Sequence, residues 1–412
     1  MKRGWLLLLG LVPFFFLQQG QATHPETWTL VIGGNNQGYL KPCGCTKPMV
    51  GGVRRRVTKT KEACAEHPSL VIETGRLAQG NPALGLTRQA EMKVETLAET
   101  LRFAMVDVIA LHPQDRFLGN AGLNGVSRLS RATLLDTSPV VPTEESVREF
   151  EKGPFGVLSH DPARGSAGMT ALSDAIQAKK ETRWIIVTAG NRDEGEKLAE
   201  RFPDVILVVY TSESQIALSP LRVGKVWVVS PGMKGQGMLR LQWNGEVLDG
   251  YEAIRLDDET PNDPDAARVY RRYQDRVRAE RLLEQLPRTS EEAYAGSKAC
   301  RSCHEDEYKI WKKSQHADAL ATLERDFHDS DPECVGCHVV GLESNQGFIA
   351  REKTPHLTDV GCESCHGPAA NHVKAPEKVR MPKKGAESCY GCHNSEHSPT
   401  FDFGTYWEKI KH

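Results

Sequence analysis

Four copies of the pentapeptide Cys-x-x-Cys-His lie between residues 300 and 393. Paired cysteines of this kind could form disulfides, bind zinc or attach haem. Zinc sites need no histidine directly after each cysteine pair, and a disulfide explains none of these histidines. With 14 histidines in 412 residues, chance would place one after all four pairs on the order of once in a million sequences. The pattern therefore predicts four covalently bound haem c groups.

Each motif would supply two thioether bonds from its cysteines and one proximal iron ligand from its histidine. The predicted attachment residues are Cys300, Cys303, Cys334, Cys337, Cys362, Cys365, Cys389 and Cys392, and the predicted proximal ligands are His304, His338, His366 and His393. A second imidazole on the other face of an iron gives a closed haem suited to electron transfer, whereas an open face can bind a small ligand.

Six more histidines in this region could fill the four remaining axial positions: His316, His328, His356, His372, His397 and His412. His316 falls on a helix expected after His304, too close along that helix to reach its own haem, so we expect it to bind a neighbouring iron. His372 follows a turn at Gly367 and Pro368 and is expected to ligate a haem other than that of His366. For His328 and His356, in polar surroundings, axial and solvated roles stay equally open.

Residues 294–412 contain too few large apolar side chains for an ordinary core. Covalent porphyrins would have to supply the missing apolar volume and act as staples. We therefore expect this region not to fold without haem.

A basic start at Lys2 and Arg3, an apolar run over residues 5–17 and a small-residue end at Gly20 and Ala22 predict a signal peptide at residues 1–22. An uncleaved N-terminal anchor is the alternative. The mature protein is expected in the periplasm, where thiols tend to be oxidised. A formal charge of −2 gives no electrostatic support for nucleic-acid binding.

Residues 23–256 alternate short apolar runs with stretches of helical periodicity, which predicts an α/β layered sandwich. The runs cover 29–32, 70–73, 107–111, 184–187 and 205–210, and the helical stretches cover 92–105 and 168–180. Three later runs, 225–231, 238–243 and 246–256, are expected to form antiparallel strands along one side. Residues 257–293 are strongly charged and predict a helical linker with a solvated face, followed by the tetrahaem region at 294–412.

Three cysteines remain outside the motifs: Cys43, Cys45 and Cys64. A disulfide from Cys43 or Cys45 to Cys64 is the favoured interpretation. A redox-active or metal-binding turn at Cys43 and Cys45, and simple burial of these thiols, are the alternatives. The run from Arg54 to Arg56 is expected to start a helix and to lie on a solvated face.

The C-terminal region resembles the multihaem cytochrome family typified by cytochrome c-554. The similar stretches are YAGSKACRSCHEDEYKIWKKSQHADAL, CVGCHVVGLESNQGF, LTDVGCESCHGPAANH and SPTFDFGTYWEKIKH. The resemblance implies a mostly helical fold with haems in closely stacked pairs, and electron transfer to periplasmic or membrane-bound redox partners. It also implies distal iron ligands at His316, His372 and either His412 or His397.

The N-terminal region, through VIGGNNQGYLKPCGCTKPMVGGVRRR, LVIETG, DVIALHPQD and FPDVILVVYTSES, looks like the calcineurin-like metallophosphoesterase fold of periplasmic 5′-nucleotidases. That resemblance implies two metals held by Asp, Asn and His after successive strands. The corresponding places here read Asn35-Asn36-Gln37, Gly75-Arg76, Leu111-His112, Thr188-Ala189 and Tyr210-Thr211. Almost every ligand is missing, and Arg76 would put a cation where a metal should sit.

The sequence thus predicts an electron-transfer cytochrome whose non-catalytic phosphoesterase-like domain serves in docking or positioning. The alternative is an oxidoreductase that acts on a small nitrogen or sulfur compound at a five-coordinate haem.

Overall fold

The computed structural model describes residues 27–42, 49–78, 87–136, 146–215, 217–382, 385–395 and 397–412. The predicted signal peptide and the two cysteines Cys43 and Cys45 lie outside these residues. Among the described residues, no helix combines the length and the apolar character that crossing a membrane requires.

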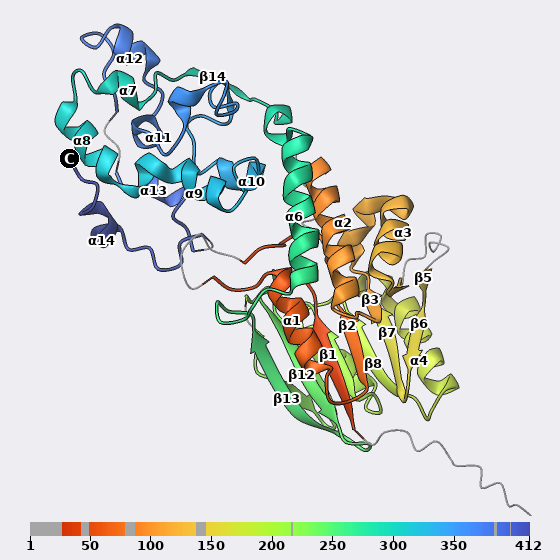
Figure 1. The fold of residues 1–412 in the computed structure, drawn as a ribbon. Helices are drawn as coiled ribbons and strands as arrows, with labels where there is room; N and C mark the ends of the chain where they lie inside the picture. Colours follow the sequence, from red (N-terminus) through yellow and green to blue (C-terminus); the bar gives the residue numbers. More distant parts are fainter. Residues whose placement is uncertain are drawn as a thin grey trace, which may run out of the picture.

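The N-terminal region is a sandwich of two sheets (Figure 1). The first sheet has the order β13-β12-β1-β2-β3-β4-β5 and the second has the order β10-β11-β9-β8-β7-β6. The strands of the first are β1 (Trp28–Gly33), β2 (Ser69–Glu73), β3 (Val108–Ala110), β4 (Thr133–Leu135), β5 (Ser146–Val147), β12 (Gly237–Trp243) and β13 (Leu248–Arg255). Those of the second are β6 (Glu149–Lys152), β7 (Phe155–His160), β8 (Arg183–Thr188), β9 (Leu207–Tyr210), β10 (Leu221–Val223) and β11 (Val226–Val229).

Strand β1 is buried along its whole length because it lies in the middle of its sheet. It pairs in parallel with β2, where Leu30 faces Leu70, and antiparallel with β12, where Leu30 faces Leu241. The predicted α/β sandwich is confirmed. Of the three later runs, 238–243 and 246–256 form the antiparallel pair β12 and β13 at one edge of the first sheet, as expected. The run 225–231 instead contributes β11 to the second sheet, where it pairs in parallel with β9 and antiparallel with β10.

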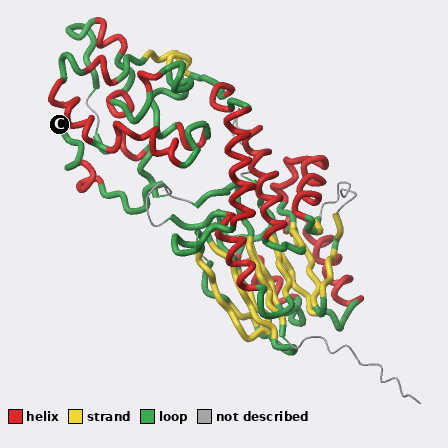
Figure 2. The backbone as a smooth tube through the Cα atoms, viewed as in Figure 1, coloured by secondary structure: helices red, strands yellow, loops and turns green. Residues whose placement is uncertain are grey.

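Helices cover both outer faces of the sandwich (Figure 2). The first sheet carries α1 (Val53–Ala63), α2 (Thr87–Phe103), α3 (Gly119–Ser130) and α6 (Pro264–Ala279), and the second carries α4 (Gly165–Ala178) and α5 (Arg192–Arg201). The core between the sheets includes Leu30, Ile72, Val157 and Ile185. Apolar strands with two buried faces require such a layered arrangement.

Helix α6 differs from the predicted solvated linker. Its apolar face, with Ala266, Tyr270, Tyr273 and Val277, belongs to the core of the N-terminal region. Its polar face pairs with α2, where Arg276 contacts Glu95 at 2.7 Å. The charged run is therefore the outer half of an amphipathic helix that is packed against α2.

The C-terminal region consists of short helices joined by long loops (Figure 1). They are α7 (Ser297–Cys300), α8 (Glu305–Lys313), α9 (Ala319–Arg325), α10 (Pro332–Val335), α11 (Cys362–His366), α12 (Ala370–Lys374), α13 (Glu387–Tyr390) and α14 (Phe403–Trp407), with a small sheet of β14 (Ser290–Ala293) and β15 (Ser344–Gln346). Its one described apolar cluster has only seven buried members, among them Leu320, Val335 and Phe348. So small a core matches the expectation that bound porphyrins supply most of the interior.

Candidate haem sites

Three pairs of histidine rings face one another in the C-terminal region. The ring centroids are 6.5 Å apart for His304 and His372, 6.1 Å for His393 and His316, and 5.8 Å for His366 and His412. An imidazole nitrogen binds a metal at about 2 Å, so two imidazoles that share one metal ion have centroids roughly 6 Å apart. Each pair joins a motif histidine to a histidine distant in sequence, and each has the spacing that one axially ligated iron requires.

Hydrogen bonds fix the orientation of several of these rings. The Nδ1 atoms of His338, His372 and His412 lie 2.7, 2.6 and 3.0 Å from the carbonyl oxygens of Ala319, Val379 and Ile410. A carbonyl oxygen only accepts, so Nδ1 must carry the proton and Nε2 keeps its lone pair. This is the tautomer that binds a metal through Nε2.

Burial also favours the metal-binding form of the histidines. It lowers the pKa of His316, His338, His366 and His393, and neighbouring histidines lower it further at His316 and His366. A neutral imidazole can bind iron, whereas a protonated one cannot. The residues present therefore fit haem, which when bound supplies one-electron redox chemistry.

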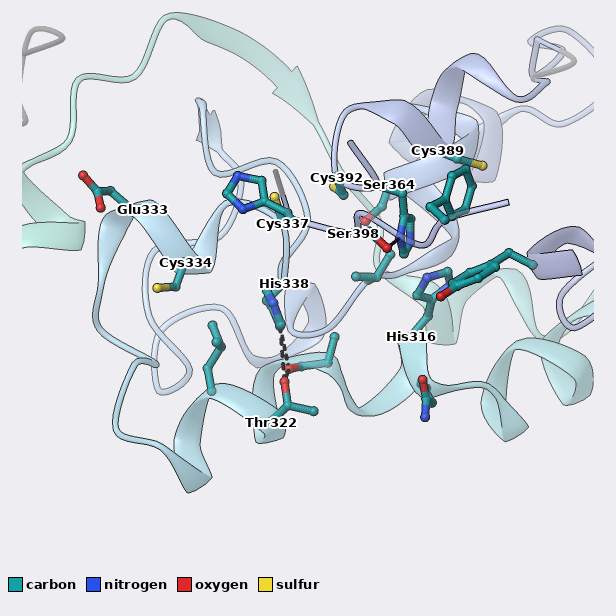
Figure 3. Close-up of a pocket in the computed structure, with 18 of the residues that line it drawn as sticks. His316, Thr322, Glu333, Cys334, Cys337, His338, Ser364, Cys389, Cys392 and Ser398 are labelled. Carbon is teal, nitrogen blue, oxygen red and sulfur yellow. Dashed lines mark hydrogen bonds between the residues drawn. The ribbon is translucent and has the colours of Figure 1, made fainter. Parts of the chain in front are cut away.

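His338 is the exception among the four motif histidines, because within the described part of the chain no histidine ring faces it. It lines a cavity of about 950 Å³ together with cysteines of the second and fourth motifs, Cys334, Cys337, Cys389 and Cys392 (Figure 3). His316 and His393 line the same cavity. The cavity thus gathers the attachment residues of two haems, one with a pair of imidazoles and one with a single imidazole.

The remaining candidate ligands lie apart from the facing pairs. Nε2 of His328 is 3.4 Å from both the Tyr270 hydroxyl and the Gln274 amide, which places this ring against α6. His356 is exposed on the short 3-10 helix Pro355–Leu357. His397 lines the large cavity without a facing motif histidine among the described residues.

Contacts between attachment cysteines give the order of the motifs in space. Cys300 of the first motif contacts Cys362 of the third, and Cys337 of the second contacts Cys392 of the fourth. Helices α11 and α13, which carry the third and fourth motifs, are neighbours. The motifs therefore follow one another in the order first, third, fourth, second.

Glu363, one of the two variable residues of the third motif, has a structural role that sequence reasoning missed. Its carboxylate is buried and accepts hydrogen bonds from the backbone N–H groups of Ala295, Gly296 and Ala369 at 2.9, 2.7 and 2.8 Å. It thereby holds the segment before the first motif against the third. Only its acidic character inside the motif could have drawn attention to it.

In the N-terminal region, a buried ion pair lies at the sheet edge where β1 and β2 end. This is the edge at which the phosphoesterase fold would place its metal ligands. Arg56 and Glu73 are 3% and 0% exposed and form a salt bridge, and Asn36 donates to Glu73 at 2.7 Å. Burial raises the pKa of Glu73, while Arg56 and Asn36 oppose that rise. Arg56 thus places a buried cation at this edge.

One prediction about arginines needs correction. The run from Arg54 to Arg56 does start α1, but its side chains do not form a solvated face: Arg55 is buried and bonds Asp258 at 2.7 Å, and Arg54 lies over the ring of Tyr270. This run was misjudged because its partners come from distant segments. Arg76 pairs with Glu213 at 2.6 Å, and its place at the metal position stays a prediction.

Cys64 follows the last residue of α1 and forms no disulfide with any described cysteine. Its predicted bridge to Cys43 or Cys45 stays a prediction, because both of those residues lie outside the described part of the chain.

Comparison with known proteins agrees with the two halves of this architecture. Residues 299–367 match the family described as cytochrome c554 and c-prime. The cytochrome c-554 of Nitrosomonas europaea is 34% identical over 142 residues, which is 26% of this chain and 60% of that relative. The match supports haem c as the cofactor of the c554-like region. The aligned part spans less than two thirds of the relative's own length.

The 5′-nucleotidase precursor of Thermus thermophilus is a solved structure that resembles this chain, with 19% identity, a TM-score of 0.51 and coverage of 73% of this chain and 68% of that one. A calcineurin-like phosphoesterase of Bacillus subtilis aligns with 9% identity and a TM-score of 0.45, over 61% of this chain and 97% of that one. The likeness to the 5′-nucleotidase shows that the N-terminal region has a metallophosphoesterase-like α/β sandwich fold.

Proposed function

We propose that this chain is a periplasmic tetrahaem c-type cytochrome that passes electrons along a row of four haems. The observation that carries the proposal is the set of three facing imidazole pairs, each including one motif histidine, with centroids 5.8 to 6.5 Å apart. Iron with two imidazole ligands exchanges electrons without binding substrate. The motif order of first, third, fourth and second gives a row with one end at the first motif and the other at the second.

A pyridine haemochrome assay on the purified protein, combined with intact mass, tests this proposal. We expect four haems per chain and four reversible one-electron reductions. Fewer than four haems would contradict it. A protein that accumulates without haem in the cytoplasmic fraction would argue against the periplasmic part, whereas residues 1–22 retained in the membrane fraction would favour the uncleaved anchor.

A second candidate function follows from His338, which no histidine ring faces among the described residues. A haem held there with one open axial face could bind and transform a small nitrogen or sulfur compound, as a five-coordinate haem permits. Ferric protein with one high-spin haem in four, and binding of carbon monoxide to that haem after reduction, would favour this function. If all haems are low-spin and none binds carbon monoxide, this second function is excluded and electron transfer is the function that remains.

We further propose that the phosphoesterase-like domain is not a phosphatase and serves to position the haem region. Two divalent ions need carboxylate ligands for charge compensation, and the buried Arg56 and Glu73 neutralise each other at that edge. We expect no hydrolysis of p-nitrophenyl phosphate or AMP with added Mn²⁺ or Zn²⁺. Metal-dependent hydrolysis that is lost in a Glu73→Gln variant would contradict this proposal.

A further inference from the structure

The segment from Asp326 to Cys334, which leads into the second haem motif, is held by the N-terminal region rather than by the other motifs. From α6, Gln274 donates to the Asp326 carbonyl at 2.8 Å, and Arg278 pairs with Asp329 at 2.6 Å. From α2, Gln89 donates to Asp331 at 2.7 Å, and Lys93 pairs with Glu333 at 2.7 Å. The phosphoesterase-like domain therefore builds one wall of the cavity in which His338 lies.

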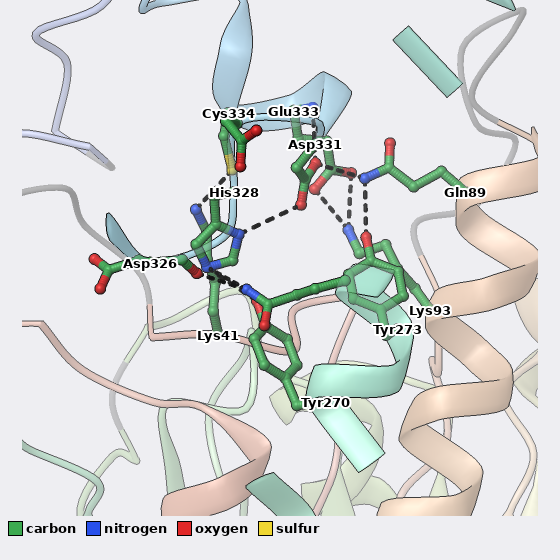
Figure 4. A network of polar contacts seen from close by, with 12 residues as sticks. Lys41, Gln89, Lys93, Tyr270, Tyr273, Asp326, His328, Asp331, Glu333 and Cys334 are labelled. Atoms are coloured by element: carbon green, nitrogen blue, oxygen red, sulfur yellow. Dashed lines mark hydrogen bonds and ion pairs between the residues drawn. The ribbon is translucent and has the colours of Figure 1, made fainter. Parts of the chain in front are cut away.

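Lys41 brings a charged group of that domain into contact with a haem attachment atom. It lies on the segment after β1, and its Nζ is 3.0 Å from Sγ of Cys334, a residue only 7% exposed (Figure 4). Since Cys334 Sγ is the predicted thioether atom, the Lys41 ammonium stands beside the porphyrin edge. The neighbouring residues Tyr39, Leu40 and Pro42 line the same cavity.

His328, Asp331 and Cys334 also resemble a metal site, because their ligand atoms lie within 4.8 Å of one another. The thioether bond uses the Cys334 sulfur, so in the haem-bound protein this cluster retains only two strong ligands and no thiolate. We therefore do not interpret this cluster as a metal site. Its charged member is the Asp331 carboxylate, and Lys41 adds the opposite charge at the same sulfur.

We propose that Lys41 sets the reduction potential of the haem bound by Cys334, Cys337 and His338, so that the phosphoesterase-like domain controls the end of the haem row. Reduction adds one electron to the iron and makes the haem less positive by one charge. A fixed cation in a poorly solvated position stabilises the reduced form and raises the potential. The negatively charged carboxylate of Asp331 lies near the same sulfur and should lower the reduction potential. The inference rests on the proposed haem at the second motif.

Redox titration of the full-length haem-loaded protein, followed by optical and electron paramagnetic resonance spectra, tests the proposal. In Lys41→Met, we expect the midpoint of one haem in four to fall by at least 59 mV, a tenfold change in the ratio of reduced to oxidised haem. Lys41→Arg keeps the charge and should keep the potential. Lys313→Met removes an exposed lysine that lines the same cavity and should leave all four midpoints in place.

Asp331→Asn removes the negative charge and should shift the potential in the opposite direction. It keeps the proposal testable if Lys41→Met fails to assemble. Asparagine also caps helices, so α10 is retained, and the midpoint of the same haem should rise. The proposal is overturned if Lys41→Met carries four haems with unchanged midpoints, or if Asp331→Asn does not raise the potential. A wild-type protein with no haem on the second motif would instead overturn the proposed function.

Discussion

At the scale of single residues, the orientation of imidazole rings decides what the haem region can do. The ring of His372 is turned toward His304 by a hydrogen bond from its Nδ1 to the Val379 carbonyl at 2.6 Å. That contact uses Nδ1 and leaves the Nε2 lone pair available to the proposed iron of the first motif. The exposed His356 has no such arrangement among the described residues.

Replacement of His372 by alanine should therefore remove one axial ligand and leave the other three irons unchanged. We expect one low-spin haem in four to become high-spin in the ferric protein, measured by electron paramagnetic resonance at low temperature. His356→Ala is the matched control and should keep the wild-type spectrum. Equal spectra for the two variants would refute the assignment of His372.

The buried pair of Arg56 and Glu73 makes a prediction about stability in the N-terminal region. Arg56→Met leaves the Glu73 carboxylate buried without its cation, which should cost about 3–5 kcal/mol of unfolding free energy. Arg56→Met/Glu73→Met, which removes both charges, should recover most of that loss. Urea unfolding followed by hydrogen exchange of peptides from β1 and β2 measures both effects.

The same pair predicts the sign of a pH dependence. Burial already raises the pKa of Glu73, and loss of Arg56 raises it further. The folded variant then holds a proton that the unfolded chain releases above its ordinary pKa of about 4.5. Stability of Arg56→Met should therefore fall as pH rises from 5 toward 8, so its deficit relative to wild type grows. A deficit that shrinks over this range would show that Glu73 is not the group responsible.

At the scale of elements, short helices of the haem region are joined by buried polar contacts instead of a continuous apolar core. The carboxylate of Glu363 on α11 ties the backbone at Ala295 and Gly296, just before α7, to the third motif. Charge-assisted hydrogen bonds of this kind are stronger than neutral ones. They compensate for the small apolar cluster around Phe348.

Glu363→Gln should weaken this connection, because an amide oxygen accepts fewer hydrogen bonds than a carboxylate and its NH₂ group would face backbone donors. We expect a loss of about 1–3 kcal/mol and a lower midpoint in thermal unfolding followed by circular dichroism in the Soret band. Glu352→Gln, at an exposed loop position, should not change that midpoint. A wild-type melting curve for Glu363→Gln would contradict the structural role.

At the scale of the whole molecule, the two regions depend on different sources of stability. The sandwich has large apolar clusters on both sides of each sheet, whereas the haem region has a single small one among its described residues. Helix α6 belongs to the first of these cores and also contacts the segment before the second haem motif. The domains are therefore joined by a packed helix at the end of the proposed haem row (Figure 1).

Expression without the machinery that attaches haem tests this division. We expect residues 27–256 to remain folded, with slow hydrogen exchange in β1, β2, β8 and β9, while residues 294–412 exchange fast and are cut by protease. Protection of the haem region in the haem-free chain would show that its own side chains suffice for folding.

The sequence by itself determined the chemistry of attachment and the class of the N-terminal fold. Repeated Cys-x-x-Cys-His motifs and alternating apolar runs are local patterns, and local patterns carry that information. The sequence could not show that His316 faces His393, that Arg56 is buried against Glu73, or that Lys41 contacts Cys334. Each of these contacts joins segments far apart in the chain, and whether a charged side chain is solvated or buried depends on which distant partner reaches it.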